Sequence, residues 1–597
     1  MRFISKFLYV FPSKGTALIP WFLAFFLSST LEVIGIGIIG PFIGFATTPN
    51  LIFNNPFLNR IYTILGFSQV NQFIALIGLL VVAIFCVKSL ISWYVQSRIF
   101  KFTYIQKEKL IARLMYGYIE APYTLYLDKN SAQVIQNVTM QTKLFADAIL
   151  NPLMSTASNI ISVLAISVLL CLVSPLAVLS LIFIAIPLFF LLNSSKGKLS
   201  LWGREMHEAN FGVIRGINHS LGGFKETRII GCGASFAEEA IDQARRFADA
   251  SISVYAFKLM PRYIVEALLV IFIVGFTSIS LLLNQNIQQL TSTLSVFAVA
   301  SIRLIPSFTT IANGVNGLRN SSHGLSELYA DIKELETVHT EVVYPRSHSA
   351  SNRITASDQK NSDIRFTKEI SLNAVSYYYP NSNQKSLDEV SLVIPKGQSI
   401  ALIGRSGAGK TTLVDVILGL LVPQSGDIRV DGVSIYGKVR SWQDMIGYIP
   451  QSIFLIDDTI ERNIAFGVPD PLIDQQKLEK AIQAAQLTEV VANLPNGIKT
   501  RVGERGVMLS GGQRQRVGIA RALYHEREIL VLDEATSALD NETENQVTEA
   551  IKALSGVKTM IIIAHRLTTV EHCDRIYLME KGQIVESGSY QEVVLQR

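Results

Sequence analysis

The chain has 597 residues, of which 49% are hydrophobic and 17% charged, with a formal net charge of +5 at pH 7. This composition is unusually apolar for a soluble protein, and so small a net charge gives no reason to expect nucleic-acid binding. The cysteines, Cys86, Cys171, Cys232 and Cys573, have no CxxC spacing, which argues against a disulfide framework or a cysteine-based metal site.

Long apolar runs are confined to the region before about residue 320, and six of them reach the roughly 20 residues needed to cross a bilayer. They lie at about 17–46, 72–97, 146–173, 176–195, 261–283 and 291–318. Lysine and arginine crowd the N-terminal segment and the connections after the second and fourth spans, whereas the other side carries Arg60 alone. The positive-inside rule therefore predicts a multi-pass protein of the inner (plasma) membrane with both termini in the cytoplasm.

The connections between the spans also predict structure. The two long inner connections lack clustered glycine or proline, which favours helices that extend into the cytoplasm. We expect a short crossing helix at the far turn of each connection, near Ser131–Val138 and Ile217–Arg228. On the outer side, Pro56–Leu65 is expected to form a small amphipathic helix.

A polar stretch after the last span separates two regions of different character. We expect a transmembrane domain at 1–336, a linker at 337–365 and a soluble domain at 366–597. The predicted fold class is an all-α six-helix transmembrane domain followed by an α/β P-loop nucleotide-binding domain.

An apolar strand in the soluble region, Ser399–Ile403, enters a glycine-rich turn that is followed by a predicted helix at Val414–Leu421. The turn fits the pattern G-x-x-x-x-G-K-[ST], in which glycines let backbone N–H groups surround a phosphate. The lysine can reach the β- and γ-phosphates, and the following hydroxyl can bind Mg²⁺. The predicted phosphate-binding residues are Gly404, Arg405, Ser406, Gly407, Ala408, Gly409, Lys410, Thr411 and Thr412.

A second arrangement suited to anions precedes the predicted helix Arg514–Tyr524. A Ser-Gly-Gly sequence at a helix N-terminus offers free N–H groups and a hydroxyl to a phosphate. Its residues are Ser510, Gly511, Gly512 and Gln513. One chain would therefore carry two phosphate-binding helix starts for a single nucleotide.

Polar side chains also follow apolar strands further along the chain. Asp533 and Glu534 end the strand Ile529–Leu532, where one carboxylate suits Mg²⁺ and the other suits a general base. Gln451 follows another strand, and His565 follows Met560–Ala564, at a place where it could sense a γ-phosphate. Alone, each of these is as easily a solvated turn or a structural histidine; their order in the chain favours function.

This order of motifs resembles the ATP-binding cassette (ABC) family over essentially the whole chain. The resemblance implies ATP and Mg²⁺ as cofactors and adds roles for an adenine-stacking tyrosine and a D-loop aspartate. By this resemblance the catalytic residues are Glu534, His565 and Gln451; Thr411, Gln451 and Asp533 hold the metal; and Tyr379 and Asp540 join the phosphate-binding residues around the nucleotide.

Six spans fused ahead of one such domain resemble a type IV exporter half-transporter. The resemblance implies a head-to-tail homodimer in which ATP lies between the phosphate loop of one subunit and the Ser-Gly-Gly sequence of the other. Membrane lipids and an amphipathic or lipid-linked substrate are the other implied partners, and nucleic acid is not expected.

Charged residues inside the predicted spans suggest a substrate site, because charge is costly to bury in lipid. They include Glu32, Lys88, Arg262 and Arg303. Our hypothesis is that Arg303, helped by Lys88 and Arg262, binds a phosphate or pyrophosphate head group, or that it pairs with Glu32. Snorkelling to the inner interface is the alternative for Lys88 and Arg262.

The span pattern resembles PglK-type lipid-linked oligosaccharide flippases and related bacterial exporters of polysaccharide or glycolipid. An exporter of peptides or bacteriocins is the alternative, and a lipid A or drug exporter also stays open. In another class, an ATP-gated channel would tolerate loss of the catalytic acid, whereas Glu534 is present.

Overall fold

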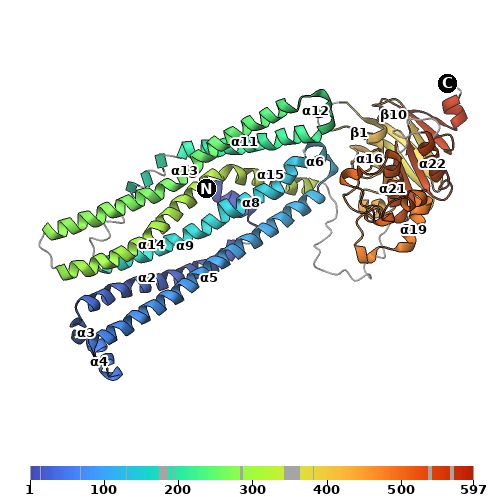
Figure 1. Cartoon of the computed structure of the whole chain (residues 1–597). Helices are drawn as coiled ribbons and strands as arrows, with labels where there is room; N and C mark the ends of the chain where they lie inside the picture. The colour runs from blue at the N-terminus through green and yellow to red at the C-terminus, as the bar shows by residue number, and fades with distance from the viewer. Residues whose placement is uncertain are drawn as a thin grey trace. The chain divides into compact units, whose positions relative to one another are not determined.

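The computed structural model describes residues 2–13, 15–67, 69–129, 131–173, 186–187, 189–190, 193–194, 196–282, 287–341, 364–380, 382, 384–534, 541–564 and 570–595. Contacts divide the chain into two compact units. Unit 1 comprises Met1–Ala121 and Lys129–Thr340, and unit 2 comprises Pro122–Asp128 and Glu341–Arg597. Figure 1 shows unit 1 built of long helices and unit 2 built of strands and shorter helices.

The described part of unit 1 is helical throughout. Its elements are α1 (Arg2–Val10), η1 (Gly15–Leu18), α2 (Ile19–Thr47), α3 (Leu51–Asn54), α4 (Pro56–Leu65), α5 (Val70–Ile119), α7 (Ser131–Gln136), η2 (Asn137–Gln141), α8 (Thr142–Leu144), η3 (Phe145–Leu150), α9 (Asn151–Val173), α11 (Lys196–Gly222), α12 (Phe224–Ile230), α13 (Gly233–Leu282), α14 (Ile287–Asn320) and α15 (Ser322–Glu341). With 50 residues each, α5 and α13 are far longer than a bilayer requires, which agrees with the predicted helical extensions.

Among the described residues, five helices are long and apolar enough to cross a membrane. They are Gly15–Thr47, Val70–Ile119, Gln133–Leu172, Gly233–Ile279 and Val296–Arg319. These correspond to five of the six predicted spans, and the remaining one, at 176–195, lies largely outside the described residues. Many of their large apolar side chains are exposed, as expected for helices that face lipid.

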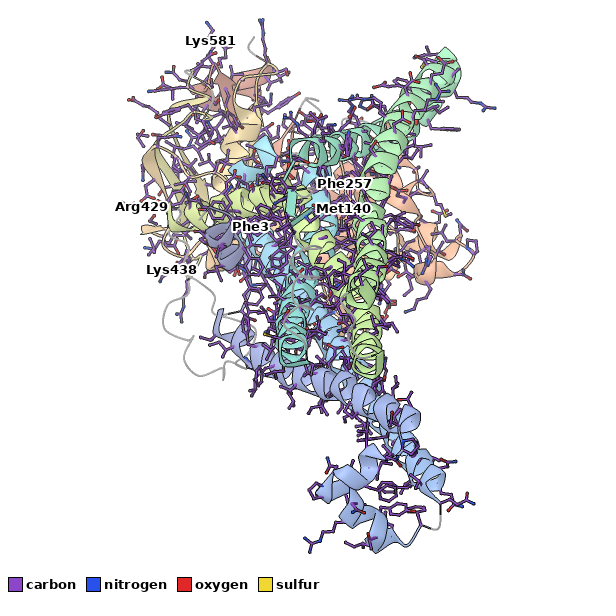
Figure 2. The ribbon with its side chains drawn as sticks, turned by 90° about the vertical axis from the view of Figure 1, so that its left-hand side faces the viewer. Phe3, Met140, Phe257, Arg429, Lys438 and Lys581 are labelled. Atoms are coloured by element: carbon purple, nitrogen blue, oxygen red, sulfur yellow. The ribbon has the colours of Figure 1, made fainter. Side chains whose placement is uncertain are left out.

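The outer connection between the first two spans contains the predicted helix as α4. Asn55 caps it by accepting hydrogen bonds from the N–H groups of Phe57 and Leu58, and Gly66, with φ of 66°, ends it. Figure 2 shows α3 and α4 at the far end of the α2–α5 helix pair.

The first inner crossing helix lies earlier in the chain than predicted. The prediction of Ser131–Val138 was wrong, because those residues begin the returning helical run through α7 and η2 towards α9. The short helix is instead α6 (Tyr123–Asp128). Its start follows from Pro122, which disfavours helical geometry in the residue before it and so separates α5 from α6. The second short helix, α12, overlaps the predicted range Ile217–Arg228 but begins only after α11 ends.

Unit 2 contains two sheets, besides α6. The first sheet is antiparallel, in the order β2-β1-β4-β5. Its strands are β1 (Glu369–Tyr377), β2 (Leu387–Pro395), β4 (Ser425–Val430) and β5 (Val433–Ser434). The second sheet has the order β10-β9-β3-β8-β7-β6 and is parallel except for β10. Its strands are β3 (Ser399–Ile403), β6 (Ile446–Ile449), β7 (Ile529–Asp533), β8 (Thr559–Ile563), β9 (Arg575–Glu580) and β10 (Gln583–Gly588).

Helices cover the parallel sheet, so β3, β7 and β8 are buried along their whole length. The helices are α16 (Lys410–Ile417), α17 (Val439–Gln443), α18 (Ile460–Ile464), α19 (Gln475–Ala484), α20 (Thr488–Ala492), α21 (Gly511–Tyr524) and α22 (Asn541–Lys552), with short turns η4 (Asp470–Leu472), η5 (Gly497–Lys499), η6 (Glu504–Gly506) and η8 (Gln591–Leu595). Because parallel strands point the same way, the polar residues that follow β3 and β7 emerge at one edge of the sheet, where ligands of such sheets bind.

Candidate functional site

The phosphate loop (Gly404–Thr412) leads from β3 into α16. Only glycine fits at two of its positions, where φ is 149° for Gly404 and 99° for Gly409. A Cβ at Gly404 would lie 2.3 Å from the Met579 carbonyl oxygen, and one at Gly409 would lie 2.6 Å from the Ser386 carbonyl oxygen. The loop is therefore held open by backbone geometry that other residues cannot adopt.

Lys410 lies across this loop, with its ammonium group donating to the carbonyl oxygens of Gly404 at 2.8 Å and Arg405 at 3.1 Å. Burial lowers the pKa of Lys410, and the negative charges of Glu534 and Asp533 offset part of that effect. The predicted lysine and the two predicted acids thus share one electrostatic environment, as a phosphate and metal site requires.

The acids at the end of β7 have defined partners. Gln451 donates from Nε2 to Glu534 Oε2 at 2.6 Å, and the Tyr448 hydroxyl lies 3.5 Å from Asp533 Oδ2. The backbone of Glu534 adopts a left-handed conformation with φ of 48°, and its N–H donates to the Ile563 carbonyl oxygen at 3.0 Å. The turn after β7 therefore holds Glu534 next to Gln451, which is the pairing that the motif order predicted.

One acid at this edge was missed by sequence reasoning. Asp415 lies on α16, and burial together with the charge of Asp533 raises its pKa to about 6. Burial also raises the pKa of Tyr448, and the charges of Asp533 and Asp415 add to that shift. A polar residue between Val414 and Val416 in a buried helix was the signal available in the sequence.

Tyr379 lies beside the start of α16, where its hydroxyl is 3.2 Å from Thr412 Oγ1. Its ring meets that of Tyr377 edge-on, with centroids 5.2 Å apart. The structure therefore places the predicted adenine-stacking residue next to the phosphate loop.

The Ser-Gly-Gly sequence begins α21 with a complete capping box. Ser510 Oγ accepts from the Gln513 N–H at 3.2 Å, and Gln513 Oε1 accepts from the Ser510 N–H at 3.0 Å. The Ser510 side chain is exposed, so this helix start is open to a ligand from outside the chain. Two other predicted site residues, Asp540 and His565, lie outside the described residues.

Residues 387–537 match the family model described as ABC transporter. An ATP-dependent lipid A-core flippase of Polaromonas sp. (strain JS666 / ATCC BAA-500) is 30% identical over 553 residues, covering 90% of this chain and 87% of that protein. The chain belongs to the ABC transporter family. Unit 2 is accordingly the ATPase domain of an ABC transporter, and unit 1 is its multi-pass membrane part.

Other relatives of this ABC transporter match over shorter stretches. The lipid A-core flippase of Ralstonia nicotianae (strain ATCC BAA-1114 / GMI1000) is 43% identical over 239 residues, so the match spans 40% of this chain and only 39% of that relative's length. A solved bacterial Atm1-family ABC exporter with ATP bound has the same fold, with a TM-score of 0.76 and 21% identity over 98% of this chain and 97% of that one.

In the membrane part of this ABC transporter, three of the four predicted charged residues come together. Glu32 on α2 is 4% exposed and forms an ion pair with Arg303 on α14. Lys88 on α5 brings its Nζ within 3.7 Å of Glu32 Oε1. The structure does not bring Arg262 to this group: it is exposed on α13 and makes no ion pair within the described part of the chain.

An apolar cavity of about 700 Å³ lies next to this group, between α2 and α5. Its lining residues are Ile39, Val81, Val82, Phe85, Cys86, Ser89 and Leu90. Lys88 Nζ lies 5.2 Å from the centroid of the Phe85 ring, so the cavity and the charged residues adjoin.

Proposed function

We propose that this ABC transporter is an ATP-driven exporter of the flippase type, which moves an anionic glycolipid or lipid-linked oligosaccharide across the cytoplasmic membrane. The observation that carries the proposal is the Glu32 cluster (Glu32, Lys88 and Arg303), in which one buried acid faces two cations. One positive charge is left over, and a phosphate group is the natural partner for a partly desolvated arginine.

The apolar cavity beside the cluster supports an amphipathic substrate. A head group held by Arg303 and Lys88 would leave a hydrocarbon chain next to Phe85 and the aliphatic residues of α2 and α5. The relatives named as lipid A-core flippases point the same way, since a lipid A-core molecule is itself a glycolipid.

For the energy source, the proposal is that Mg²⁺–ATP binds at the phosphate loop in a head-to-tail homodimer. Lys410 would leave its backbone carbonyl partners for the phosphates, Asp533 and Thr411 would hold the metal, and Glu534 would orient and deprotonate the attacking water. The exposed Ser510 helix start would complete the site of the partner subunit. Both termini would lie in the cytoplasm, on the side of the basic connections.

The substrate is tested by ATPase stimulation of the full chain in nanodiscs, with lipid A-core lipids, polyprenyl-pyrophosphate-linked sugars, peptides and hydrophobic drugs as separate additions. Stimulation by a phosphate-bearing glycolipid is expected, and R303A should weaken its half-maximal concentration by about tenfold, as loss of a charged hydrogen bond does. R262A is the matched control, because Arg262 is a span arginine outside the cluster.

A second variant separates binding from structure. E32Q removes the acid that competes for Arg303, so it should tighten the response to the anionic lipid, whereas damage to packing would weaken it. Stimulation only by peptides or drugs would establish the alternative exporter classes instead. Ion conduction without turnover would establish an ATP-gated channel, and either result would end the glycolipid proposal.

A further inference from the structure

Outside both sites, a buried acid on α15 collects polar partners from three other parts of unit 1. Asp331 is 6% exposed, and its Oδ2 accepts hydrogen bonds from the Tyr118 hydroxyl and from Asn137 Nδ2, the latter at 3.2 Å. Its Oδ1 accepts from Lys129 Nζ at 2.5 Å. We call these four residues the Asp331 cluster.

Lys129 is held in the cluster as a cation. Its side chain is 13% exposed, and it also contacts Glu334 Oε2 at 2.9 Å. Burial alone would lower the pKa of Lys129, but its bonds to Asp331 and Glu334 outweigh burial and raise it. A buried ion pair of this kind adds little net stability over an apolar pair, yet removing one partner leaves an unpaired buried charge. Its value therefore lies in specifying one arrangement of the chain.

The position of the cluster in the chain shows which arrangement that is. Tyr118 belongs to the last turn of α5, and Lys129 directly follows α6. The segment between them, Pro122–Asp128, belongs to unit 2. Asp331 thus holds both ends of the segment that leaves unit 1, contacts unit 2 and returns.

Within unit 2, α6 reaches residues of the nucleotide site. Tyr123 packs against the apolar core that contains Leu413 and Val414 of α16, together with Tyr379. Burial raises the pKa of the Tyr123 hydroxyl, and the charges of Asp415 and Tyr379 add to the effect. A change at the phosphate loop therefore has a direct contact with α6.

On the other side of the cluster, α15 follows α14 after a single turn residue, Ser321. Arg303 of the Glu32 cluster lies on α14. The helix that receives α6 through Asp331 is therefore continuous in sequence with the helix that carries the proposed head-group residue.

We infer that Asp331 is a positioning residue, which ties both ends of α6 to α15 so that nucleotide-driven changes in unit 2 reach α14 and α15. It touches neither nucleotide nor substrate. The inference goes beyond the transported molecule and holds for any substrate.

The test follows hydrogen–deuterium exchange of the full chain in nanodiscs, without nucleotide and with ATP plus vanadate, which traps the hydrolysed nucleotide. The unsubstituted chain should show nucleotide-dependent changes in uptake both at residues 399–417 and at residues 287–341. In D331N the change at 399–417 should persist, while the change at 287–341 should fall by at least about half. A merely structural role would reduce both changes together.

Two further variants keep the test decisive. K129M approaches the cluster from the other partner and should give the same split. E336Q is the matched control, because Glu336 is also an ion-paired acid on α15 but bonds Arg113 and Tyr9 rather than a residue flanking α6. A response at 287–341 that survives in D331N and K129M, or that is absent from the unsubstituted chain, would overturn the inference.

Discussion

At the scale of single residues, the nucleotide site depends on charges that are held close together before any ligand arrives. Lys410 is bonded to backbone carbonyls, which a phosphate can replace at little structural cost. Glu534 is held by Gln451 and by a left-handed backbone turn. The acids Asp415 and Asp533 repel each other, and the bound metal would relieve that repulsion.

That repulsion makes a prediction about pH. The pKa of Asp415 is raised from 3.8 to about 6, by burial first and by Asp533 second. Because the folded state holds this proton more tightly, the stability it contributes is present below about pH 4 and is lost as the pH rises through about 6. D415N should therefore raise the free energy of unfolding of the Mg²⁺-free protein by about 1 kcal/mol near neutral pH, after allowance for solvent screening.

Thermal unfolding of the full chain in EDTA measures this effect. The gain in melting temperature of D415N should shrink as the pH is lowered from about 7.5 towards 4. D457N serves as control, since Asp457 is an exposed acid of the same unit. Destabilisation by D415N at neutral pH would show that the carboxylate has a favourable partner instead.

At the scale of helices, small residues let α14 approach α9 closely. A Cβ built on Gly314 would lie 1.9 Å from Thr156 Oγ1 and 3.4 Å from the Pro152 carbonyl oxygen. Thr156 is β-branched and 7% exposed, so its side chain has little freedom to move away. Close approach of this kind is how helices associate in a membrane, where no hydrophobic force drives them together.

G314A should therefore destabilise the membrane part by about 1–3 kcal/mol, because overpacking outweighs the gain in helix propensity. The double variant G314A/T156A should recover most of the loss, since it removes the atom that clashes. G275A on α13 is the matched control, because a Cβ there meets nothing within 4 Å. Melting temperatures of the three variants in detergent measure the effect, and equal behaviour of G314A and G275A would contradict the tight seam.

At the scale of the whole molecule, each chain carries a complete set of nucleotide motifs, but the structure gives them different settings. The phosphate loop is closed by its own lysine, whereas the Ser510 helix start is exposed. A homodimer with two composite ATP sites uses both.

Mixed dimers test this arrangement. K410A and S510R chains should each form inactive homodimers, because every composite site then contains the damaged motif. A mixed dimer of the two should regain roughly half of the hydrolysis rate of the unsubstituted protein, since one of its sites combines the undamaged phosphate loop and helix start. Phosphate release by purified, doubly tagged mixed dimers is the measurement. Mixtures that stay inactive would mean that each chain uses its own motifs.

Local patterns in the sequence were sufficient for the spans, the strands and the phosphate loop. Hydropathy over a bilayer's length predicted the five described spans, and Gly404, Gly409 and Lys410 predicted the loop, because both depend on residues close together in the chain. The resemblance to the ABC family likewise rested on motif order. The same local reading misplaced the first crossing helix, since it gave too little weight to Pro122.

Tertiary structure alone decided which distant residues meet. Glu32, Lys88 and Arg303 come from three helices, and only the packing of those helices joins them and leaves Arg262 apart. The partners of Asp331 and the raised pKa of Asp415 arise in the same way. The physical reason is that the energy of a buried charge depends on neighbours in space, and sequence spacing does not determine those neighbours once helices extend for 50 residues.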